Sequence, residues 1–77
     1  MDIRRTVGEN IRRFRAAAGM SQEELAVRMG VDQGYISSLE AGRRNPTVLT
    51  LWHAAIALGV MPEHLLRQDS AAIGASF

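Results

Sequence analysis

The side chains that could carry chemistry in this 77-residue sequence are mostly arginines. All nine basic residues are arginine, whose planar fork of donors suits phosphate groups and guanine edges. The two histidines, His53 and His64, lie on different predicted helices without an acidic cluster beside them, and cysteine is absent. No hydroxyl has a visible general base, and no phosphate-binding loop is evident. We therefore expect no metal site, no cofactor and no enzymatic activity.

The charge is nearly balanced but unevenly distributed. The net charge is +1, to which residues 1–44 contribute +2 and residues 45–77 contribute −1. This bias is mild, so charge alone indicates little about nucleic acid. The longest apolar run, residues 54–61, is shorter than the roughly 18 residues that a membrane span needs. No N-terminal targeting segment is evident, and we expect a cytoplasmic protein without a membrane partner.

The elements that must position the polar side chains are predicted to be helices of one small domain. The chain is rich in alanine and leucine and poor in threonine and aromatic residues, which disfavours a sheet. We predict an all-α bundle of five helices, with a domain at residues 1–67. The predicted tail, residues 68–77, is either flexible or packed at a dimer interface. The helices run from about residue 3 to 18, from Ser21 to Gly30, from Asp32 to Gly42, from Thr47 to 58 and from Pro62 to 67.

Local signals support these boundaries. Ser21 and Glu24 have the spacing of a capping box, in which each side chain bonds to the other residue's backbone N–H. Four apolar stripes at helical spacing predict the core. They are Val7, Ile11, Phe14 and Ala18; Leu25, Ala26 and Met29; Tyr35, Ile36 and Leu39; and Val48, Leu51, Ala55 and Leu58.

The second and third predicted helices have the spacing of a helix-turn-helix. With Gln22 counted as the first position, Ala26 is fifth, Gly30 ninth and Ile36 fifteenth. A small residue at Ala26 lets the next helix cross closely, and Gly30 can take the left-handed conformation that the turn needs. Ile36 would bury the inner face of the later helix, which leaves the outer face free to enter a major groove.

At this point the sequence resembles a known family. The segments SQEELA (residues 21–26), GV (30–31) and YISSLEAGRRNP (35–46) are similar to the XRE family, the Cro and phage-repressor type of helix-turn-helix protein. The similarity covers about residues 7–66. It implies a lambda repressor-like helical fold and a protein that binds double-stranded DNA to regulate transcription.

The resemblance also implies roles for individual residues. In the family, the glutamine matched by Gln22 contacts phosphate and braces the start of the recognition helix. Gln33 stands at a base-reading position, where its amide can pair bidentately with adenine. Gly34 has no side chain to read with, which departs from members that carry a long polar residue there. The implied DNA-contacting residues are Gln22, Gln33, Gly34, Ser37 and Ser38, with Arg43, Arg44 and Asn45 in the following loop.

An acidic residue at the position of Glu40 pairs with an arginine of the first helix in the resembling repressors, and Arg15 matches that arginine by its spacing. We expect a largely buried Arg15–Glu40 ion pair that orients the motif.

The fourth predicted helix is apolar over a wider arc than one core face requires. This excess indicates a second burial surface, and we expect a partner subunit to cover it. Cover by Ile73 and Phe77 of the tail is the alternative. The candidates for the dimer interface are Trp52, Ile56, Leu65 and Leu66.

These inferences favour a homodimer that binds duplex DNA sequence-specifically on an inverted repeat, with half-sites about 34 Å apart. The alternative is an antitoxin or a protein-interaction module, whose main partner is a toxin or another protein. Asp32 is acidic and Gly34 has no side chain, and both lie where base contacts are expected, which keeps this alternative open.

Overall fold

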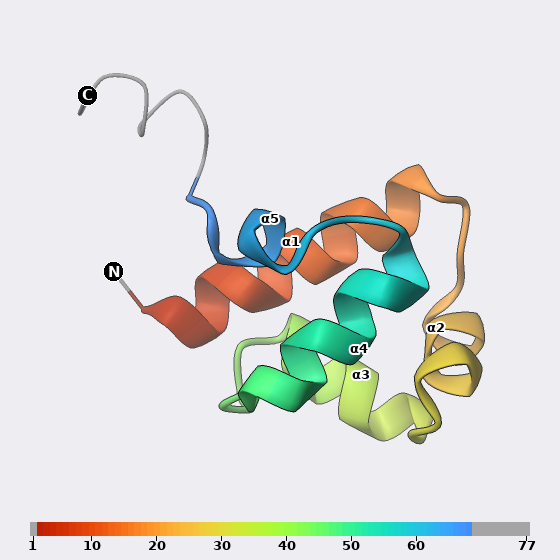
Figure 1. The fold of residues 1–77 in the computed structure, drawn as a ribbon. Coiled ribbons are helices and arrows are strands. Elements are labelled where there is room, and N and C mark those ends of the chain that lie inside the picture. Colours follow the sequence, from red (N-terminus) through yellow and green to blue (C-terminus); the bar gives the residue numbers. More distant parts are fainter. Residues whose placement is uncertain (1, 69–77) are drawn as a thin grey trace.

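The computed structural model describes residues 2–68, and this part of the chain folds into five helices without a strand (Figure 1). The predicted all-α class is therefore confirmed, and each helix begins and ends within two residues of its predicted boundary. None of these helices combines the length and apolar character that crossing a bilayer needs. Apart from Gln68, the predicted tail lies outside the described residues. The helices are α1 (Ile3–Ala17), α2 (Gln22–Met29), α3 (Gln33–Glu40), α4 (Val48–Leu58) and α5 (Pro62–Leu66).

Short polar side chains cap the starts of α2, α3 and α4. Ser21, Asp32 and Thr47 each accept a hydrogen bond from the backbone N–H three residues on, at 3.0, 2.8 and 3.0 Å. The expected capping box at Ser21 is only half formed. The Glu24 carboxylate accepts from Arg28 at 2.8 Å, one turn further along the helix, instead of returning to the Ser21 N–H.

All five helices contribute side chains to one core. α1 packs against α3 along one side and against α5 along another, while α4 packs against α2 and α5. This arrangement puts α3 at the edge of the bundle, with one face against α1 and α2. The largest fully buried side chains are Val7, Ile11, Leu25, Ile36, Leu39 and Leu65.

Two residues predicted on core stripes are instead exposed, because each lies at a helix end. Val48 is 84% exposed: it is the first residue of α4, and the buried residues of that helix begin further along, at Ala54. Ala18 is exposed because α1 ends at Ala17 and Ala18 already belongs to the turn. The predicted stripes are thus wrong at the start of α4 and just beyond the end of α1, and their other residues lie in the core or pack against it.

The expectation that Leu65 lies at an outer interface is wrong. Leu65 is fully buried in the core, whereas the adjacent Leu66 is exposed. α5 is a single short turn, so it can direct only one of two neighbouring leucines inward. Its position is set by Asn10 of α1, which is itself buried and donates through Nδ2 to the carbonyl oxygens of Leu65 at 2.9 Å and Arg67 at 2.7 Å.

Gly8 sets the distance between α1 and α3. A Cβ atom at this position would lie 2.2 Å from the Leu39 carbonyl oxygen and 2.9 Å from that of Glu40. Both atoms belong to the backbone of α3, so they cannot move aside as a side chain would. The close approach of α3, and with it the placement of the helix-turn-helix, therefore requires glycine here.

Candidate nucleic-acid interface

α2 and α3 are joined by a tight turn that begins at Gly30. Gly30 has a φ of 72°, a left-handed conformation that side-chain-bearing residues rarely adopt. The Val31 N–H donates to the Ala26 carbonyl oxygen at 3.0 Å, which closes the turn on the last turn of α2. Ala26 is buried where the two helices meet. This geometry is a helix-turn-helix, with α3 as its second helix.

α3 has one buried face and one open face. Ile36 and Leu39 are buried in the core. Four α3 residues were expected to read bases. One of them, Ser38, is half-buried, so fewer residues are open to DNA than expected. The remaining three are exposed: Gln33, Gly34 and Ser37.

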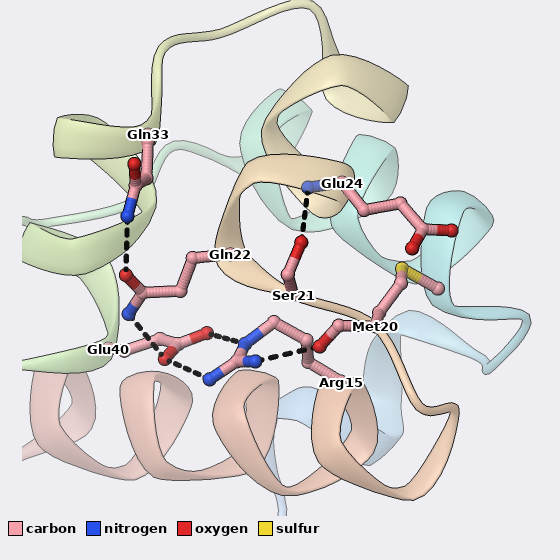
Figure 2. A network of polar contacts seen from close by, with 7 residues as sticks. All are labelled: Arg15, Met20, Ser21, Gln22, Glu24, Gln33 and Glu40. Carbon is pink, nitrogen blue, oxygen red and sulfur yellow. Dashed lines mark hydrogen bonds and ion pairs between the residues drawn. The ribbon is translucent and has the colours of Figure 1, made fainter.

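Behind α3, a network of polar side chains joins it to α1 and to the start of α2 (Figure 2). Arg15 donates through Nε to Glu40 Oε2 at 2.6 Å and through Nη2 to Glu40 Oε1 at 3.0 Å. Its Nη1 donates to the Met20 carbonyl oxygen at 2.8 Å. The Arg15 side chain is 16% exposed and the Glu40 side chain 5%, so the ion pair is largely shielded from water. The hydrogen bond to Glu40 raises the pKa of the Arg15 guanidinium.

Gln22 extends this network to the first turn of α3. Its Nε2 donates to Glu40 Oε1 at 3.0 Å, and its Oε1 accepts from Gln33 Nε2 at 3.3 Å. Both ends of the Gln22 amide therefore bond to other side chains of the protein. Gln33 stays exposed, and its Oε1 makes no hydrogen bond to any residue from 2 to 68. The start of α3 thus presents an open acceptor to solvent, as Figure 2 shows.

The loop after α3 exposes Arg43, Arg44 and Asn45. Arg44 Cζ lies 5.0 Å from the centroid of the Tyr35 ring, which is within cation–π range. The Tyr35 hydroxyl in turn lies 3.3 Å from Thr50 Oγ1. Sequence reasoning identified Tyr35 only as a core residue, because no helical spacing links it to Arg44. In the described part of the chain neither arginine forms an ion pair, so both charges face solvent.

α4 presents an exposed apolar surface, made by Val48, Leu49, Trp52 and Ile56, which we call the α4 surface. Trp52 is 53% and Ile56 62% exposed. α4 contains no charged residue at all. Leu66 of α5 is also exposed, so of the four residues expected at a dimer interface only Leu65 is buried in the core.

The histidines do not form a shared site. His64 Nδ1 accepts from the Met61 N–H at 3.3 Å, and its ring centroid lies 6.3 Å from that of Phe14. His53 is exposed on α4. Between residues 2 and 68, no three His, Cys, Asp or Glu side chains lie together as a metal site would require.

The fold and the braced α3 define a helix-turn-helix protein, and similarity to known sequences specifies the family. The helix-turn-helix family model HTH_3 matches residues 11–65. The chain is 57% identical, over 60 residues, to an uncharacterized HTH-type transcriptional regulator of Sinorhizobium fredii, a match that covers 78% of each chain. The chain belongs to this helix-turn-helix family, and the resemblance to XRE-type regulators is confirmed.

Solved structures with the same fold include proteins of known role. The restriction-modification controller protein C.AhdI of Aeromonas hydrophila has a TM-score of 0.77 and 35% identity, over 80% of this chain and 94% of that chain. SinR, a master regulator for biofilm formation solved in complex with DNA, has a TM-score of 0.75 and 34% identity, over 79% of this chain and 98% of that chain. The similar proteins are thus named as regulators or controllers.

Proposed function

We propose that this chain regulates transcription as a homodimer that binds duplex DNA sequence-specifically on an inverted repeat. The observation that carries the proposal is the exposed polar edge of α3. Gln22 and the largely shielded Arg15–Glu40 pair hold this edge from behind, and the following loop adds the solvent-facing charges of Arg43 and Arg44. A helix presented in this way fits the major groove, which is about 12 Å wide. SinR, which shares this fold, was solved with DNA bound.

Base reading is assigned to the exposed edge of α3. The Gln33 amide, once released from Gln22, pairs bidentately with adenine. Ser37 lies about one turn further on the same face and hydrogen-bonds a base or a phosphate. Gly34 leaves space for a thymine methyl group or a bridging water. Ser38 is half-buried and therefore has the smallest share in readout.

Phosphate binding is assigned to residues on either side of this edge. Gln22 opens α2, where backbone N–H groups and the helix dipole favour an anion. Arg43, Arg44 and Asn45 contact the phosphate backbone from the loop after α3. Stacking on Tyr35 restricts the motion of Arg44, so less side-chain entropy is lost when it binds. Because each neutralised phosphate releases counterions, binding weakens as salt rises.

Dimerisation is assigned to the α4 surface together with Leu66. An apolar helix face without a single charge is costly to leave in water and suits a second copy of the same patch. To read two successive major grooves, the two α3 helices of such a dimer lie about 34 Å apart, one turn of the duplex, and the two-fold symmetry requires an inverted repeat.

The test is selection from a randomised duplex pool at about 0.15 M salt, where nonspecific phosphate binding is suppressed. Enrichment of an inverted repeat is the expected result. Enrichment of a single half-site would remove the dimer from the proposal but keep DNA reading.

A second candidate function is binding to another protein, as an antitoxin or an interaction module. Two observations favour it: the α4 surface would also suit a foreign chain, and Asp32 and Gly34 weaken the reading edge. No enrichment from a protein shown to be folded by circular dichroism would favour this function over DNA binding.

A further inference from the structure

The arginines of the described chain fall into two classes, those that pair with a carboxylate and those that do not. Arg4, Arg5, Arg15 and Arg28 each form an ion pair. Among residues 2–68 the other five form none, and two of these, Arg43 and Arg44, belong to the proposed DNA surface. The remaining three, Arg12, Arg13 and Arg67, gather at a different place.

These three arginines line one open groove, about 730 Å³ in volume, between the outer side of α1 and the chain that follows α5. Among the described residues that line it, only Glu9 is acidic, and Glu9 Oε1 lies 3.2 Å from the Nε atom of Arg5, so its charge is already compensated. The groove as a whole is positive. Thr6, Asn10, Ala16 and Gln68 complete its lining.

One end of the groove adjoins a smaller pocket of about 210 Å³. The two share Asn10, Arg13, Arg67 and Gln68, and the smaller one adds the side chains of Phe14 and His64. Together they form one channel, with arginines along the larger part and two aromatic side chains in the smaller part. Its Asn10 is held by the carbonyl oxygens after α5 and by Arg13, so this wall of the channel is fixed.

The groove lies on a different side of α1 from the DNA-reading motif. Arg15 faces Glu40 of α3, whereas Asn10 faces Leu65 and Arg67 at the end of α5. Figure 1 shows α5 beside α1 at the part of the bundle away from α2. If α3 occupies a major groove, as proposed above, the basic channel stays open to a further partner.

We propose that this channel binds an acidic segment of a partner protein in an extended conformation. Three exposed guanidinium groups, none of which pairs with a carboxylate of residues 2–68, provide the charge complementarity. The aromatic part accepts an apolar side chain of the same segment. A small anion would leave most of its surface in water in so open a groove, which disfavours it as the ligand.

The probe is a short fluorescein-labelled polyglutamate peptide with one central leucine, followed by fluorescence anisotropy at about 0.15 M salt. The test variant combines Arg12→Gln with Arg67→Gln. Arg13 is left unchanged because it also bonds to Asn10. The matched control combines Arg43→Gln with Arg44→Gln, which removes the same charge from two other exposed arginines that form no ion pair within residues 2–68.

The groove variant should lose about tenfold in peptide affinity, as expected for two exposed charge pairs, and the control less than about twofold. Equal losses in both variants, or a loss in the control alone, would show that the peptide only mimics DNA and would overturn the proposal. Competition by inorganic pyrophosphate at concentrations similar to those of the peptide would overturn it in favour of a small anion.

Two further measurements keep this result independent of folding and of the proposed function. Amide chemical-shift mapping of the unaltered protein with the same peptide should locate the largest changes at residues 6–16 and 67–68; changes confined to α3 would contradict the assignment. Duplex DNA should bind the groove variant normally and the control weakly. If the unaltered protein binds no DNA, the proposed function fails and the peptide comparison still stands.

Discussion

Arg15 shows how one side chain can hold several elements together. Its three nitrogen groups donate to Glu40 and to the Met20 carbonyl oxygen, so it ties α1 to α3 and to the chain that enters α2. The raised pKa of Arg15 means that this stabilisation is fully present below the unfolded-state pKa of the guanidinium. It is lost only as pH rises through the still higher folded-state pKa, so Arg15 adds no pH dependence near neutrality.

Removing one partner of the Arg15–Glu40 pair should lower the free energy of unfolding by more than the pair itself contributes to stability. Arg15→Met or Glu40→Gln alone leaves a partner in a largely shielded site, and each should lower the free energy of unfolding by roughly 3 kcal/mol. The double variant should cost clearly less than the sum, with a coupling above about 1 kcal/mol, measured by urea unfolding. Additive effects would mean that the two side chains act independently.

Gln33 and Arg43 should separate base reading from phosphate binding. Gln33→Ala should relax the preference at one base pair of each half-site, at a cost of about 1–3 kcal/mol for the preferred sequence. Arg43→Ala should weaken binding to all duplexes and reduce the salt slope by about one unit. Affinities at several salt concentrations, on the selected site and on a variant site, distinguish the two. If neither change affects DNA binding, the wrong surface has been assigned to the duplex.

At the scale of elements, α1 acts as the frame on which the motif is mounted. Gly8 admits the carbonyl end of α3, and Asn10 binds the carbonyl oxygens that follow α5. Neither residue belongs to the apolar stripe that predicts α1. From the sequence alone, a glycine inside a helix and a polar residue beside a core stripe look unfavourable for α1. In the folded chain these two residues position α3 and α5 against it.

Two glycine-to-alanine changes should therefore have opposite effects. Gly8→Ala should destabilise the fold by roughly 1–3 kcal/mol, because the new Cβ meets the backbone of α3. Gly34→Ala should stabilise α3 by up to about 1 kcal/mol, because alanine favours a helix more than glycine does. The new Cβ would meet only Asp32 Oδ1, at 3.2 Å, and this oxygen needs to shift by a few tenths of an ångström while it still caps α3. Both are read from urea unfolding midpoints. A Gly8→Ala protein as stable as the parent would show that α1 and α3 can separate freely.

At the scale of the whole molecule, the uncharged α4 surface is the feature that the packing of residues 2–68 leaves uncovered. The alternative cover, Ile73 and Phe77 of the tail, lies outside the described residues. A domain this small has a limited core, and burying such a surface in a dimer would add stability as well as symmetry. In the proposed dimer, stability, self-association and the inverted repeat of the DNA site therefore depend on one another.

Ile56→Arg tests this link, with Val27→Arg as the matched control. Both residues are exposed apolar side chains, but Val27 lies on α2, outside the α4 surface. Ile56→Arg should weaken self-association at least about tenfold in sedimentation equilibrium, because it puts a charge into an apolar interface. Val27→Arg should leave it unchanged. A parent protein that stays monomeric at high concentration contradicts the dimer itself.

The sequence by itself determined the helices, their caps and the turn of the motif. These features depend on residues a few positions apart. The Ser21 side chain caps the Glu24 N–H, the Asp32 side chain caps the Tyr35 N–H, and Gly30 adopts the left-handed conformation of the turn. Such local signals remain readable without the rest of the fold. The Arg15–Glu40 pair joins residues 25 positions apart, and it was expected only because the sequence resembles a family.

Only the tertiary structure decided which surfaces are inside and which side chains meet. It buried Leu65 rather than Leu66, placed Arg44 over Tyr35 and gathered Arg12, Arg13 and Arg67 at one groove. The physical reason is that helical periodicity specifies the direction in which a side chain leaves its own helix. It carries no information on which other helix packs on that side. Asn10 meets the backbone of Leu65 across 55 residues of chain, and that contact exists only once the helices have packed.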